Sequence, residues 1–159
     1  MKTMDILVPI AIVSMLLYFF IAAQGAFYLF GFSKALYNVP VENFIELRKA
    51  VDPVVRGRFK ILYLSTLFMM TVWFFSMDKS AGFSSYAFVL LALLLLVTDL
   101  VLILKLSEPV NEVINGDILN TTESFNAVRK QWLEAIVVRG YLSVTGLTLL
   151  IIHLIVNSR

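Results

Sequence analysis

The chain has 159 residues, of which 60% are hydrophobic and 15% charged, and its mean hydropathy is +0.88. A water-soluble domain of this length could not bury so much apolar surface. The chain has no cysteine and one histidine, which excludes disulfide scaffolds, thiolate zinc sites, iron–sulfur clusters and bis-histidine haem. We therefore expect a single membrane domain over residues 1–159, with no metal site and no cofactor.

Four apolar stretches are long enough to cross a bilayer, because about 20 helical residues span a hydrocarbon core of about 30 Å. They are residues 6–32, 61–77, 86–104 and 135–156. The first is far longer than the apolar core of a signal peptide, which favours a true span. The second is short, and Pro53, with Asp52 as a cap, predicts a helix start before it. The sequence thus predicts an all-α fold, an integral membrane antiparallel four-helix bundle.

Basic residues are unevenly divided between the two sides of such a bundle. Three would lie on the side of the termini: Lys2, Lys79 and Arg159. Ten would lie with the long connections 33–60 and 105–134: Lys34, Arg48, Lys49, Arg56, Arg58, Lys60, Lys105, Arg129, Lys130 and Arg139. The positive-inside rule therefore predicts a multi-pass protein of the cell (inner) membrane with both termini outside and both long connections cytoplasmic. Their charge favours contact with membrane lipids over nucleic acid.

The two long connections carry signals for short amphipathic cytoplasmic helices. Pro40 is typical of a first helical position and precedes an amphipathic stretch that ends near Val51. Ser107 and Pro109 predict a second short helix that runs through Ile114. Both segments are interpreted as lying at the membrane interface.

A longer helix is expected to follow the second connection. Asn115 and Gly116 are typical of a turn, and Asn120, with Glu123 three residues later, has the spacing of a capping box. We expect the helix that begins there to continue without a break into the span 135–156.

Asp99 and Arg139 are the charged residues that the membrane must accommodate. An isolated acid at the centre of a span costs roughly 2.5–3.5 kcal/mol. Asp99 lies a few residues before the end of the third span, and Arg139 lies a few residues inside the fourth from the same side. At roughly 1.5 Å per residue their depths match, which predicts an ion pair. Two interpretations of the pair stay open: it locks the helices together, or it is part of a charged ligand site or catalytic site.

One stripe of the fourth span is expected to face the bundle interior. Its members share helical spacing: Trp132, Arg139, Ser143, Gly146, Leu150 and His153. The indole of Trp132 and the guanidinium of Arg139, two turns apart on this stripe, would leave a space between them in which a flat organic molecule could stack. A packing seam with close helix approach at Gly146 is equally consistent with the pattern. His153 is interpreted as an interfacial residue.

The first two spans also carry polar stripes. Gln24, Tyr28 and Gly31 share a face of the first. The corresponding stripe of the second is Tyr63, Thr66, Met70 and Trp73. A buried amide needs hydrogen-bond partners, so Gln24 is expected to point toward the charged pair. For Gln24 the alternatives are ligand contact and hydrogen bonding between helices, and for Tyr63 they are ligand contact and an aromatic belt.

The segment Glu108-Pro109-Val110-Asn111, followed by Trp132 and Arg139 at the entry of an apolar span, resembles the anthrone-oxygenase-like family of four-span membrane proteins. Much of that family is classed as a domain of unknown function. The aromatic run after Gly25 and the segment from Phe44 to Pro53 are similar to the family's first span and the amphipathic segment after it. The order of spans and connections resembles the family over nearly the whole chain, but only a few individual residues match the family's motifs.

The resemblance implies a four-helix membrane bundle and, for some relatives, oxygenation of polycyclic anthrone-like phenols without a recognisable metal or flavin. It carries over Asn111, Trp132 and Arg139. Family members often have a histidine between the Trp and the Arg, where this chain has Ile136 and Val137. This departure argues against histidine-dependent chemistry.

A chemistry can be fitted to these residues. Asp99 or a bound water would take a proton from an activated carbon, while Arg139 and Asn111 would stabilise the developing enolate oxygen. Trp132 would stack the ring, and the carbanion would react with dioxygen directly. The predicted catalytic residues are Asp99 and Arg139, and the predicted substrate-binding residues are Gln24, Asn111, Trp132 and Tyr63.

A non-enzymatic membrane subunit is the alternative from another functional class. It would be an oligomeric scaffold or would recruit a protein partner through segments 41–57 and 107–134. The exposed basic residues expected to bind that partner are Arg48, Lys49, Arg129 and Lys130. A homo-oligomeric pore is a third interpretation, in which a polar stripe faces a symmetry axis. A cavity beside Asp99 would favour a small-molecule site, and tight packing there would favour a scaffold.

Overall fold

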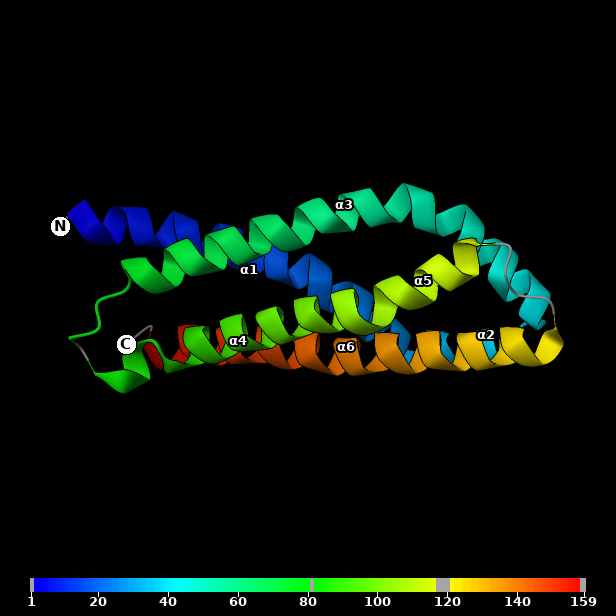
Figure 1. The fold of residues 1–159 in the computed structure, drawn as a ribbon. Helices are drawn as coiled ribbons and strands as arrows, with labels where there is room; N and C mark the ends of the chain where they lie inside the picture. The colour runs from blue at the N-terminus through cyan, green and yellow to red at the C-terminus, as the bar shows by residue number, and fades with distance from the viewer. Residues whose placement is uncertain (1, 81, 117–120, 158–159) are drawn as a thin grey trace.

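The computed structural model describes residues 2–80, 82–116 and 121–157, and the described chain is all-α. Its main helices are α1 (Lys2–Phe27), α2 (Ser33–Tyr37), α3 (Val41–Ser76), α4 (Ala87–Leu102), α5 (Glu108–Asn115) and α6 (Thr122–Asn157). Figure 1 shows four antiparallel rods: α1, α3, α4 continued by α5, and α6. The predicted four-helix bundle is confirmed, and each rod is long and apolar enough to cross a membrane.

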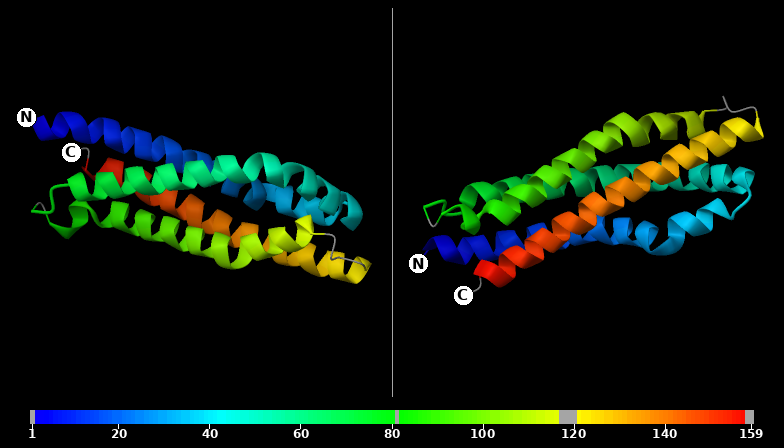
Figure 2. Two further views of the ribbon diagram at one scale, coloured as in Figure 1. Left: turned by 45° about the horizontal axis from the view of Figure 1, so that its top comes forward. Right: turned by 90° about the horizontal axis from the view of Figure 1, so that it is seen from below.

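Different elements of the chain form the two ends of the bundle. The chain termini and the connection between α3 and α4 lie at one end, called the terminal end (Figure 1). The short helices α2 and α5 and the starts of α3 and α6 lie at the other, called the connection end, as both views of Figure 2 show. The bundle therefore has the topology expected of a multi-pass protein with both termini on the same side.

Helix α3 is one continuous helix from Val41 to Ser76. Pro40 stands immediately before it in an extended conformation, with φ −48° and ψ 137°. The prediction that the helix of the second span starts at Pro53 was wrong, because Pro53 lies inside the helix. Asp52 does not act as a cap; its buried carboxylate accepts hydrogen bonds from Arg48 and Asn115. The amphipathic segment and the second span are thus parts of the same rod.

Irregular turns shape the first and third rods. Tyr28–Phe32 (η1) joins α1 to α2, and Gly31 within it has φ 141°, a conformation that favours glycine. Ile103–Ser107 (η3) is a π-helical turn that leads into α5. Such turns commonly mark functional sites. The short helix predicted after Ser107 and Pro109 is confirmed as α5.

Helix α6 is unbroken from Thr122 to Asn157, which confirms that the helix after the second connection continues into the last span. The predicted cap at Asn120 lies outside the described residues. Between α3 and α4, the three-residue helix η2 (Phe83–Ser85) closes the connection at the terminal end.

The residues that the structure describes form two hydrophobic cores. The larger lies between the spans and contains Tyr18, Tyr63, Met70, Trp73, Leu96 and Leu150. The smaller lies at the connection end and contains Leu36, Phe44, Val110, Ile114, Trp132 and Leu133. The apolar faces of α5 and of the start of α3 are therefore covered by the protein itself, instead of lying on the bilayer surface as expected.

The predicted stripe of α6 faces the interior, where it meets α1 closely. A Cβ atom added to Gly25 would lie 2.8 Å from the Cα of Gly140, and one added to Gly146 would overlap the Tyr18 hydroxyl. This is the small-residue packing expected at Gly146. His153, expected at the interface, is buried instead, and its ring centroid lies 5.5 Å from that of Trp73.

The outward faces of the spans are strongly apolar. Large exposed hydrophobic side chains follow their outer surfaces: Ile12, Phe20, Ile61, Phe68, Leu94 and Leu154. Contiguous apolar surface of this kind requires a partner, and in four rods of this length and composition that partner is the lipid hydrocarbon.

Candidate functional site

Three helices bring Asp99, Arg139 and Tyr63 together. Arg139 Nε on α6 donates a hydrogen bond of 2.7 Å to Asp99 Oδ1 on α4, which confirms the predicted pair. The Tyr63 hydroxyl on α3 donates to Asp99 Oδ2 over 2.6 Å and accepts a bond of 3.0 Å from Arg139 Nη2. Asp99 is only 1% exposed. Both charges are thus paired and hydrogen-bonded, as buried charges must be.

Ser107 completes the coordination of this guanidinium. Arg139 Nη1 donates to Ser107 Oγ over 3.3 Å, so each of its three nitrogens binds a different acceptor. The orientation of Arg139 is therefore fixed from three sides. The sequence pattern identified Ser107 only as a helix-start signal, because nothing near it in the sequence shows that it lies beside Arg139, which is 32 residues away on another helix.

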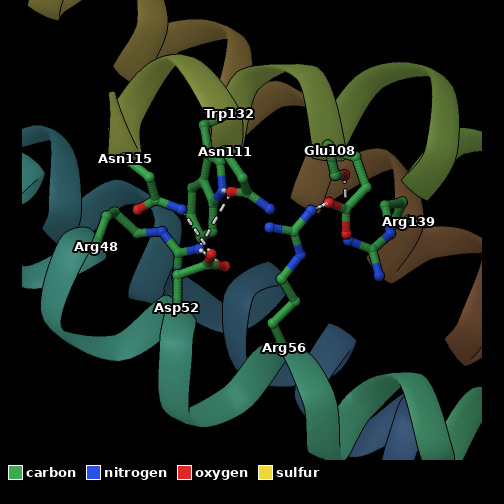
Figure 3. Close-up of polar contacts among 9 residues, drawn as sticks. Arg48, Asp52, Arg56, Glu108, Asn111, Asn115, Trp132 and Arg139 are labelled. Atoms are coloured by element: carbon green, nitrogen blue, oxygen red, sulfur yellow. Dashed lines mark hydrogen bonds and ion pairs between the residues drawn. The ribbon is translucent and has the colours of Figure 1, made fainter. Parts of the chain in front are cut away.

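A second polar cluster lies beside the first and includes Arg48, Asp52, Asn111, Asn115 and Trp132 (Figure 3). Arg48 Nη2 donates to Asp52 Oδ1 over 3.2 Å and to Asn111 Oδ1 over 3.3 Å. Trp132 Nε1 donates to the same Asn111 oxygen over 3.0 Å, and Asn115 Nδ2 donates to Asp52 Oδ2 over 2.8 Å. These bonds tie α3, α5 and α6 together.

The indole of Trp132 is enclosed by this cluster. The Cζ atom of Arg48 lies 4.3 Å from the centroid of the ring, a cation–π contact, and Tyr28 and Phe44 meet it edge-on with centroid distances of 5.7 Å each. Trp132 is 5% exposed. A guanidinium therefore occupies the ring face that was expected to stack on a ligand.

Arg48 is a site residue that sequence reasoning misplaced. It was expected to be an exposed residue for binding a partner, but its side chain is only 12% exposed. Its Nε atom is buried without a hydrogen-bond partner among the described residues. Arg129, placed in the same exposed group, donates to the backbone oxygen of Val39. The i,i+4 spacing of Arg48 and Asp52 on an amphipathic helix was the signal available.

A cavity of about 840 Å³ lies between the four rods and touches both polar clusters. Its polar lining includes Gln24, Arg48, Tyr63, Asn111, Trp132 and Arg139. Its apolar lining includes Phe59, Leu64, Leu100, Ile103, Leu104 and Ile136. Leu64 and Leu104 are 52% and 66% exposed, so the cavity opens on the apolar outer surface. Its volume lies within the range of about 300–1,000 Å³ of small-molecule sites.

Most of the residues predicted for the site line this cavity together: Gln24, Tyr63, Asn111, Trp132 and Arg139. Asp99 is not part of the lining, because Tyr63 and Arg139 stand between its carboxylate and the cavity. Gln24 lines the wall without a hydrogen bond to any described residue, so its amide shares a cavity with the charged pair but does not bind it.

A third ion pair closes one side of the lining. Arg56 on α3 binds Glu108 on α5, and Figure 3 shows the two side chains extended toward each other beside Arg139. These side chains are 44% and 25% exposed, far more than those of Asp99 and Arg139. The pair therefore lies at the rim of the cavity.

No family model matches the chain, and no curated protein or solved structure matches it.

Proposed function

We propose that this protein binds a flat, amphipathic small molecule, of the phenol or quinone type, within the cavity between the four rods. The observation that carries the proposal is the cavity itself. It places hydrogen-bond donors fixed by buried ion pairs against an apolar wall that opens on the outer surface. A molecule dissolved in lipid could enter through that opening without crossing water. The scaffold alternative gives no reason for such a cavity.

The polar wall suits an oxygen atom on the ligand. The Oδ1 atom of Asn111 already accepts two hydrogen bonds, while its Nδ2 donates to no described residue. Arg139, held by three acceptors, faces the same space. These donors would bind a carbonyl or phenolate oxygen, and the apolar wall would take the ring. In this proposal Trp132 contributes by orienting Asn111.

Oxygenation of the bound phenol, as the resemblance to the anthrone-oxygenase-like family implies, is the second candidate. The hydrogen-bonded chain from Tyr63 to Asp99 favours it. Tyr63 would accept a proton from the activated carbon as it passes its own to Asp99. Arg139 and Asn111 would stabilise the enolate oxygen, and dioxygen would take up the electrons as the second substrate, one of its atoms being retained and the other leaving as water.

The test is mass spectrometry of small molecules extracted from purified protein. Wild type and Asn111→Leu are compared, because Asn111→Leu removes the donor and leaves the Asp99–Arg139 pair intact. Lys130→Gln, at an exposed position on α6, is the matched control. We expect an aromatic ketone or phenol with wild type and control that is lost with Asn111→Leu. Phospholipid alone in all three would contradict the proposal and favour the scaffold.

We also propose the orientation that the basic residues predict, in the cell (inner) membrane with the termini outside and the connection end in the cytoplasm. Because the chain has no cysteine, single cysteines report sidedness directly. Lys79→Cys, between α3 and α4, should react with a membrane-impermeant maleimide in intact cells. Lys34→Cys should react only after permeabilisation, and the reverse pattern would invert the orientation.

A further inference from the structure

The cavity between the four rods is longer than a flat ring. Its lining on α3 runs from Arg48 to Leu64, which is about 24 Å along the helix axis at about 1.5 Å per residue. Its volume of about 840 Å³ lies in the upper part of the range of about 300–1,000 Å³ for small-molecule sites. One aromatic ring, or two fused rings, would occupy less than half of this length. The ring of the proposed ligand would therefore leave a large part of the cavity empty.

The two ends of the cavity differ in polarity. The division is clearest on the rod formed by α4, η3 and α5, where the lining changes from apolar to polar between Leu104 and Ser107. The apolar part consists of Leu100, Ile103 and Leu104, and the polar part consists of Ser107, Glu108, Asn111 and Glu112. Because this rod runs toward the connection end, the polar part of the cavity lies on that side (Figure 1). Arg139 joins the polar part through its bond to Ser107.

The apolar part is the one that opens on the outer surface. Leu64 and Leu104 both line the cavity, and they are 52% and 66% exposed. Beyond this opening, Phe68 follows Leu64 one turn further along α3, and Val101 precedes Leu104 by about one turn. Both of these side chains are exposed. A hydrocarbon chain that leaves the cavity here would therefore continue over apolar side chains.

The apolar part needs an occupant of its own kind. Side chains around an empty space lose dispersion contacts, and a water molecule needs two to four polar partners, which leucine and isoleucine side chains do not supply. A hydrocarbon chain needs no hydrogen bond and matches such a wall. The polar part offers donors that a hydrocarbon chain cannot use. Each end of the cavity thus suits a different part of one molecule.

We propose that the ligand is a phenol or quinone that carries one long hydrocarbon tail. This inference rests on the proposed function and names the class of ligand more closely. The ring would lie in the polar part against Ile136, with its oxygen toward Asn111 and Arg139. The tail would follow the apolar part and leave the cavity at the opening lined by Leu64 and Leu104. A compact polycyclic phenol, which the family resemblance implies, would leave that opening unused.

The experiment compares menadione with phylloquinone, which have the same methylnaphthoquinone ring, while only phylloquinone carries a phytyl tail. Both are offered together to purified full-length protein in detergent, and native mass spectrometry gives the ratio of phylloquinone to menadione that the protein retains. The chain has no cysteine with which menadione could react. We expect wild type to retain phylloquinone preferentially, because only its tail fills the apolar part.

Two variants separate the tail from the ring. Leu104→Trp narrows the opening and should lower the ratio about tenfold, because a tail forced past a larger side chain overpacks the site. Asn111→Leu removes a donor to the ring oxygen and should lower the retention of both quinones. Leu154→Trp, the same substitution at an exposed position of α6 outside the lining, is the matched control. Circular dichroism checks that each variant is folded.

The outcomes distinguish this inference from the proposed function. Retention of neither quinone by wild type would contradict the proposed function, and this inference with it. Equal retention of both, or retention of menadione alone, would keep the ring site and overturn the tail. An unchanged ratio with Leu104→Trp would overturn the exit at the opening. An equal fall with Leu154→Trp would show that the preference does not depend on the cavity.

Discussion

The carboxylate of Asp99 is separated from the cavity by the hydroxyl of Tyr63, which binds it over 2.6 Å. A carboxylate exposed beside Arg139 would repel an anionic group at this part of the cavity wall. In this arrangement the phenol presents a neutral group to the cavity, while the acid behind it keeps the charge of Arg139 balanced. At this part of the wall a balanced ion pair therefore stands behind fixed hydrogen-bond donors.

Loss of one member of the buried pair should destabilise the bundle strongly. Arg139→Met leaves Asp99 charged and without its guanidinium, which is expected to cost about 3–5 kcal/mol. Unfolding in detergent, followed by circular dichroism, measures it. The double variant with Asp99→Leu should recover much of the loss, because no uncompensated charge remains. Equal stability of the single and double variants would contradict this account.

Tyr63→Phe keeps the ring and removes the hydroxyl that joins Asp99 to Arg139. We expect a cost of about 1–3 kcal/mol, because two buried groups lose a partner while the ion pair remains. The extracted ligand should still be present. If the protein is an oxygenase, turnover of a phenolic substrate should be lost, and full turnover by this variant would exclude the proton path through Tyr63.

The ion pair at the rim should contribute much less than the buried pair. Arg56→Gln and Glu108→Gln, alone and combined, form a double-mutant cycle for which we expect a coupling of about 0–1 kcal/mol, because both side chains are partly exposed to solvent. Thermal unfolding in detergent measures the coupling. A value near that of a buried pair would show that the rim is closed to water.

Two glycines should respond in opposite ways to the same substitution. A Cβ atom at Gly140 would lie 2.9 Å from the backbone oxygen of Gly25, so Gly140→Ala should force α1 and α6 apart at a cost of about 1–3 kcal/mol. Gly57→Ala meets no neighbour and should stabilise α3 by up to about 1 kcal/mol. Thermal unfolding of the two variants, compared side by side, tests the prediction.

The lengths of the apolar stretches, and the depths of the charged residues within them, predicted most of the fold and one part of the site. The four rods follow from apolar length, and the Asp99–Arg139 pair follows from matched depth, because an unpaired charge in hydrocarbon is too costly. The stripe that contains Trp132 and Gly146 follows from helical spacing. Each of these inferences uses the sequence of a single helix, or compares the depths of two residues on two helices.

The remainder depends on how distant segments pack. Pro53 was wrongly taken as a helix start, because a proline inside a membrane helix is tolerated where neighbouring helices pack against it. Arg48 looked like surface charge because nothing in its local sequence shows that Trp132 and Asn111 will lie against it. The phenol that screens Asp99 likewise comes from a helix far away in the sequence. Such contacts depend on how three helices pack against one another, which the sequence of any one of them does not show.

The lengths of α3 and α6 have a consequence for how the protein sits in lipid. Each has 36 residues and is about 54 Å long, against a hydrocarbon thickness of about 30 Å. Part of each helix therefore lies beyond the hydrocarbon, and the smaller core is on that side, at the connection end. A thicker or thinner bilayer would be met by tilting or by a vertical shift of the whole bundle rather than by local bending. Bilayer thickness would then set how deeply the cavity mouth is submerged.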